Sequence, residues 1–173
     1  MVLTIDIKKS LISDYLNFLF QTDEDGCFLV TRKNLAGRFI CAMVEYSYKP
    51  THNTGSVTMV LPSCPALKSG EKRYIYLSTE SQAKVNDYLE AIFDLDFERY
   101  WMQGVKMNIP QKDIIYAFIN SRKLATFEQD PETLKKRIYR SSTRKLQSIY
   151  KQLLNKAHYT DRIISEQLKD DVI

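Results

Sequence analysis

Side chains that bind transition metals are scarce in this sequence, which has two histidines and three cysteines among 173 residues. His52 and His158 stand far apart, with no neighbouring metal-ligand types at useful spacing, and no CxxC pair occurs. A structural zinc site needs about four clustered Cys or His ligands, so we expect no metal and no other cofactor. The cysteines Cys27, Cys41 and Cys64 are odd in number and widely spaced, which indicates free thiols in a reducing compartment.

Motifs for catalysis and for membrane insertion are missing as well. The phosphate loops GxxxxGK and GxGxxG and the nucleophile motif GxSxG do not occur. No apolar run approaches the ~18 residues of a transmembrane helix, and the N-terminal residues MVLTIDIKKS lack the basic-then-apolar order of a secretion signal. We therefore expect a cytoplasmic protein without a membrane partner, and we favour a protein that is not an enzyme.

Positive charge, in contrast, is concentrated in one segment late in the chain. Asp130 and Pro131 form a helix-start signal, because aspartate caps free backbone N–H groups and proline suits the first helical position. Residues 132–156 then hold eight basic residues and one acid, a net charge of +7, whereas the whole chain carries +4. The rest of the chain is therefore net acidic.

This basic segment has the periodicity of an amphipathic helix, at about 100° per residue. Its apolar side consists of residues three or four apart: Leu134, Ile138, Ser142, Leu146, Ile149, Leu153 and Ala157. We expect its other side, with Lys136, Arg137, Arg140, Arg144 and Lys151, to meet nucleic-acid phosphates. Further candidate contacts in the segment are Lys135, which departs from this division, and Tyr139, Ser141 and Ser142. The alternatives are a solvated surface helix and a helix that pairs with an acidic surface.

Hydrophobic periodicity predicts an α+β fold that is predominantly helical, with an α/β part over residues 1–78 and a helical part over 79–173, or both packed as one domain. The expected elements are a helix over 6–20 capped by Asp6, a strand over 27–30, a helix over 32–46 capped by Thr31, a hairpin of strands 56–61 and 73–77, a helix over 79–103 opened by Thr79, and a helix over 109–123. We expect Gly104 to end the long helix, Asn108 to cap the next one, and Gly37 to mark a close approach of another backbone.

Two arrangements found in DNA-binding domains fit parts of this pattern. The helix over 109–123 and the basic helix form a helix-turn-helix-like pair, with a connection longer than the usual three or four residues. In the other arrangement, residues 1–78 are winged-helix-like and the hairpin tip is the wing. Lys68, Lys72 and Arg73 would then be secondary nucleic-acid contacts. Ordinary α+β packing is the alternative to both.

The helix over 79–103 also carries an acidic face, in which Asp87, Glu90, Asp94 and Glu98 are three or four residues apart and Asp96 lies nearby. Magnesium sites need converging carboxylates, so a metal-dependent nuclease is a weaker alternative function. The main alternative is a protein-interaction or self-associating module, in which this acidic face pairs with the basic helix.

Several segments together resemble a group of small proteins carried on mobile elements and phages of gut bacteria: NLAGRFICAMVEYS, YIYLSTE, VNDYLEAIFDLDFERYW, QKDIIYAFI and ETLKKRIYR. The resemblance covers about residues 27–157. It carries over no catalytic residue, and it implies an accessory protein that acts near element DNA. We therefore expect a non-catalytic DNA-binding accessory or regulatory protein, whose partners are DNA and a second copy or another protein.

Overall fold

The computed structural model describes residues 1–51, 55–63, 74–125 and 131–137. It shows a mixed α+β protein in which helix predominates, as the sequence predicts. The chain divides into two compact units, Met1–Pro131 and Glu132–Ile173. Residues on both sides of Ser78 belong to the first unit.

A four-stranded sheet has the strand order β1-β5-β3-β2. Its strands are β1 (Val2–Ile5), β2 (Gln21–Thr22), β3 (Phe28–Leu29) and β5 (Val57–Val60). The central strand β5 runs antiparallel to β1, with Leu3 opposite Met59, and parallel to β3. Side chains along a strand point to alternate faces, and the core-facing residues of β1 and β5 are Leu3, Ile5, Val57 and Met59. The strands expected over 27–30 and 56–61 are confirmed, whereas β1 was not foreseen.

The expected hairpin of strands 56–61 and 73–77 is wrong, although both strands form. β6 (Tyr74–Tyr76) pairs with β4 (Glu45–Ser47), antiparallel, in a separate two-stranded sheet. Both edges of β5 are already paired, by β1 and β3, so neither is open to β6. A wing built from β5 and β6 is therefore wrong as well.

Helix α1 (Ser10–Leu19) begins later than the periodicity predicts, and Lys9 rather than Asp6 precedes it. The Asn86 side chain, from helix α3 (Thr79–Lys106), donates to the Asp6 carbonyl oxygen at 2.9 Å and accepts from the Lys8 N–H at 3.1 Å. These bonds hold residues 6–8 against α3, so that the helix starts only beyond them.

Helix α2 (Leu35–Met43) is capped by Asn34, not by Thr31, because the Asn34 side-chain oxygen accepts from the Gly37 N–H at 2.7 Å. The helix is shorter than the expected range 32–46, since the chain enters β4 at Glu45. The prediction for Gly37 is confirmed: a Cβ there would lie 1.9 Å from the Thr31 carbonyl oxygen.

Helix α3 is 28 residues long and passes through Gly104, where the sequence predicts its end. Its cap is Ser78 rather than Thr79, and the Ser78 hydroxyl oxygen accepts from the Ser81 N–H at 3.3 Å. Gly104 is buried, and a Cβ there would lie 2.6 Å from Cδ1 of Ile114. The glycine therefore permits close packing of the next helix instead of ending α3.

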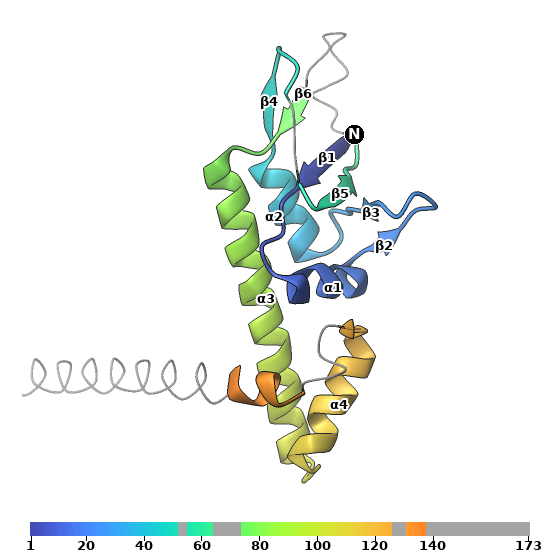
Figure 1. The fold of residues 1–173 in the computed structure, drawn as a ribbon, viewed down its shortest axis with the longest axis vertical. Helices are drawn as coiled ribbons and strands as arrows, with labels where there is room; N and C mark the ends of the chain where they lie inside the picture. The colour runs from blue at the N-terminus through green and yellow to red at the C-terminus, as the bar shows by residue number, and fades with distance from the viewer. Residues whose placement is uncertain (52–54, 64–73, 126–130, 138–173) are drawn as a thin grey trace, which may run out of the picture. The chain divides into compact units, whose positions relative to one another are not determined.

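That next helix, α4 (Gln111–Arg122), is preceded by Pro110 and not capped by Asn108. Asn108 has a φ of 56° and follows the last turn of α3, so it belongs to the turn between the two helices. Figure 1 shows α4 beside the C-terminal half of α3, whereas the β4–β6 sheet lies at the other end of α3.

The apolar faces expected for α3 and α4 are largely confirmed as the core of the first unit. The buried residues of the two faces are Val85, Leu89, Phe93, Phe97, Ile114, Ile115, Phe118 and Ile119. Aromatic rings join the helices, since Tyr15 meets Phe93 edge-on at 5.1 Å between centroids and Phe97 lies 4.7 Å from Phe118. Tyr100 and Trp101 are only half-buried.

Candidate nucleic-acid interface

The structure describes the start of the expected basic helix, and residues 131–137 are helical. Leu134 is buried, Lys136 is exposed, and Lys135 and Arg137 are half-buried. The Lys135 ammonium lies 3.8 Å from the Glu132 carboxylate, one helical turn earlier. These residues have the division expected for an amphipathic helix, with an apolar side chain inside and a lysine outside.

The other expected contacts lie outside the described residues: Tyr139, Arg140, Ser141, Ser142, Arg144, Lys151, Lys68, Lys72 and Arg73. The same holds for the connection over 126–130 and for the two histidines. The helix-turn-helix-like pairing of α4 with the basic helix therefore stays a prediction.

Glu90 of the acidic face of α3 and the nearby Asp96 form ion pairs within the first unit. The Lys9 ammonium forms an ion pair with Glu90. The Arg122 guanidinium binds Asp96 through two hydrogen bonds, Nε to Oδ2 at 2.8 Å and Nη2 to Oδ1 at 3.1 Å. Within the described ranges, no group of three or more His, Cys, Asp or Glu side chains is placed to hold a metal ion. Glu90 and Asp96 thus have basic partners in their own unit.

Arg122 belongs to a cluster that sequence reasoning missed. Its guanidinium carbon lies 4.0 Å from the ring centroid of Phe18 and 5.3 Å from that of Phe118. The Tyr15 hydroxyl donates to Asp96 Oδ2 at 2.9 Å. Burial raises the pKa of Tyr15, and the Asp96 charge raises it further. The hydrogen bonds to Asp96 raise the pKa of Arg122. The cluster connects α1, α3 and α4, and no spacing within one helix could have revealed it.

The structure describes two of the three cysteines, and the surroundings of Cys27 disfavour its reactive form. Cys27 and Cys41 are free and half-buried. Burial raises the pKa of the Cys27 thiol, and the neighbouring Asp23 and Asp25 charges raise it further. Because the thiolate is the reactive form, this environment makes Cys27 a poor nucleophile.

A second feature missed from the sequence is a set of tyrosines on the β4–β6 sheet. Tyr46 lies in β4, Tyr74 and Tyr76 lie in β6, and Tyr48 follows β4 by one residue. The repeated Tyr-x-Tyr pattern, YSY and YIY, was the available signal. Sequence reasoning placed Tyr46 in a helix, so the four tyrosines were not grouped together.

Comparisons with protein families, curated proteins and solved structures find no match for this chain. Among the helices that the structure describes, none is long and apolar enough to cross a membrane.

Proposed function

We propose that this protein is a non-catalytic DNA-binding accessory or regulatory protein of a mobile element, and that residues 132–156 contact the phosphates. The observation that carries the proposal is the net charge of +7 on this segment in a chain whose total is +4. Cations gathered on one helix release counterions from DNA when they bind it, which favours association.

The described start of the segment supports this proposal. Helical residues 131–137 bury Leu134 and expose Lys136, so at least one basic side chain of the segment is accessible. Extension of the same helix would repeat this division along Arg140 and Arg144. The competing interaction module is less favoured, because Glu90 of the acidic face and the nearby Asp96 have basic partners in the first unit.

A titration of labelled duplex DNA at two or more salt concentrations tests the proposal. We expect the affinity to fall steeply with salt, with a log–log slope of about −0.9 for each neutralised phosphate. Lys136→Gln combined with Arg140→Gln should make that slope shallower by up to about 1.8. The matched control changes Lys106 and Lys112, which are exposed lysines of the first unit, to Gln.

The control removes the same total charge, so it separates docking of this helix from a general effect of net charge. Equal losses in both double variants would contradict the proposed contact surface. Absence of duplex binding at low salt would reject the proposed contact of residues 132–156 with duplex DNA. A mass that rises with concentration as salt falls would support self-association instead.

A further inference from the structure

The β4–β6 sheet is a two-stranded ribbon that presents tyrosine rings to solvent. Its register places Tyr46 opposite Ile75 and Ser47 opposite Tyr74. The exposed fractions are 70% for Tyr48, 43% for Tyr46 and 40% for Tyr74. Isolated exposed tyrosines are common on proteins, but three within so short a ribbon form a local aromatic surface.

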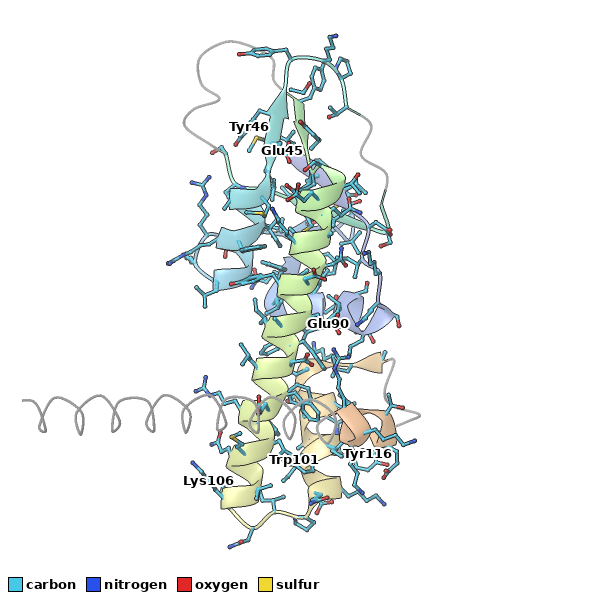
Figure 2. The ribbon with its side chains drawn as sticks, turned by 90° about the vertical axis from the view of Figure 1, so that its left-hand side faces the viewer. Glu45, Tyr46, Glu90, Trp101, Lys106 and Tyr116 are labelled. Atoms are coloured by element: carbon cyan, nitrogen blue, oxygen red, sulfur yellow. The ribbon has the colours of Figure 1, made fainter. Side chains whose placement is uncertain are left out.

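The base of this ribbon is fixed to the rest of the first unit. Ile75 of β6 is buried, as are Val44 directly before β4 and Leu77 directly after β6. Glu45 accepts hydrogen bonds from the hydroxyls of Ser78 and Ser81, at the start of α3. The exposed rings therefore stand on an anchored base, which lowers the entropic cost of binding a ligand. Figure 2 shows Tyr46 and Glu45 on β4 above the first turns of α3.

The segment that follows β4 is also held in place. The Lys49 N–H donates to the Ser47 hydroxyl oxygen at 3.1 Å, and the Thr51 hydroxyl donates to the Ile75 carbonyl oxygen at 3.4 Å. These bonds keep residues 47–51 next to β6. Tyr48, the most exposed ring of the set, lies in the bend that directly follows β4, and this bend precedes the bond from Thr51 to β6.

The charge around these rings is suited to a polyanion. Residues 46–51 and 74–76 include no acid, and they include the exposed Lys49. The nearest acid within the ribbon, Glu45, is bound by the serines of α3. Glu45 lies at the end of β4 that faces the start of α3, whereas Lys49 follows the other end of β4, so a phosphate beside Tyr48 would meet the Lys49 cation first.

We propose that the ribbon is a stacking site for single-stranded nucleic acid, with Tyr46 and Tyr48 taking unpaired bases and Lys49 contacting a phosphate. Aromatic rings beside cations are the usual means by which proteins hold unpaired bases. Two residues of extended chain span about 6.6 Å, so each ring can take a separate base. Bases within a duplex are already stacked, so the site discriminates against duplex DNA. The inference does not depend on the basic helix.

Fluorescence anisotropy with the full chain tests this site, using a labelled 12-nucleotide DNA strand, the RNA of the same sequence, and the corresponding duplex. Tyr48→Ala should weaken binding of the DNA strand by about 5-fold or more, because loss of one stacked base costs at least that much. Tyr48→Phe is the matched control, and it should keep the affinity within about 2-fold because the ring remains. Lys49→Gln should reduce the salt slope on the single strand by about 0.7.

The outcomes also separate this site from the basic helix. Loss of duplex binding in the Lys136→Gln, Arg140→Gln variant with single-strand binding retained supports an independent ribbon site. Wild-type affinity in Tyr48→Ala and Tyr46→Ala, or an equal loss in Tyr48→Phe and Tyr48→Ala, overturns the stacking site. If the wild-type chain binds the duplex but neither single strand, the stacking site on the ribbon is rejected and the proposed function is unaffected. Binding of the RNA but not the DNA strand assigns the site to RNA.

Discussion

Two tyrosine–carboxylate pairs stabilise the first unit, one between its helices and one at the base of the ribbon, and they differ in burial and in charge. Tyr15 is 1% exposed and donates to Asp96, which also binds the Arg122 guanidinium. Tyr76 hydrogen-bonds Glu45, whose other partners are the neutral hydroxyls of Ser78 and Ser81.

The same two side-chain types therefore have different roles. In the helical pair, the Arg122 guanidinium neutralises the Asp96 carboxylate in a largely buried environment. Removal of Asp96 or Arg122 therefore leaves the other charge uncompensated. In the ribbon pair, the serines lower the pKa of Glu45, and the hydrogen bond to Glu45 raises the pKa of Tyr76. The first arrangement joins three helices, and the second connects a strand to a helix start.

Asp96→Ala should give the largest effect, because it leaves Arg122 without its partner while that side chain is only 16% exposed. We expect the free energy of unfolding to fall by about 3 kcal/mol, measured by urea denaturation. Asp87→Ala, at an exposed position of the same helix, is the control and should change it by less than ~0.5 kcal/mol. Similar values for the two variants would show that the bond between Asp96 and Arg122 contributes no more to stability than an exposed carboxylate of the same helix does.

The next effect concerns alkaline pH and Tyr15. Burial raises its pKa in the folded protein, so the stability it contributes is present below the unfolded pKa and is lost as pH rises toward the folded value. Above about pH 10, wild-type stability should fall more steeply than that of Tyr15→Phe, by up to about 1.4 kcal/mol per pH unit. Denaturation of both proteins between neutral pH and pH 11 measures this. Parallel curves would show that the hydroxyl ionises equally in the two states.

The smallest effect is expected at the helix start beside the ribbon. Ser78→Ala removes the cap of α3 and one partner of Glu45, and should cost about 1 kcal/mol. Thr79→Ala is the control, since Thr79 already lies inside the helix and should cost little. A larger loss of stability in Thr79→Ala than in Ser78→Ala would indicate that Thr79 caps the helix, as the sequence pattern predicts. Hydrogen exchange of the β4 and β6 amides should report the Ser78 change, because Glu45 then loses a donor.

Features that depend on the residues of a single helix or strand could be predicted from the sequence, whereas features that depend on contacts between elements could not. The buried positions of α3, such as Leu89 and Phe93, follow from helical spacing alone and were predicted correctly. The strands that pair with β5 were not predicted correctly. The alternation of apolar and polar residues shows which side chains a strand buries, but not which strand lies beside it. Gly104 misled for a similar reason: its role is set by Ile114 on another helix.

The candidate sites show the same limit. The charge of the segment 132–156 is a property of consecutive residues, so the sequence alone predicts it. The tyrosine ribbon requires Tyr46 and Tyr74, far apart in the chain, to reach adjacent strands. Its recognition therefore depended on the pairing of β4 with β6.

The central position of β5 has a consequence for synthesis of the chain. Leu3 pairs with Met59, so the first strand is made long before its partner, and its apolar side chains have no sheet to join until then. The α3–α4 hairpin, by contrast, is built from neighbouring segments and can pack soon after it is made. During synthesis, β1 therefore stays unpaired until β5 has been made. It is the part of the nascent chain that a chaperone would most usefully cover.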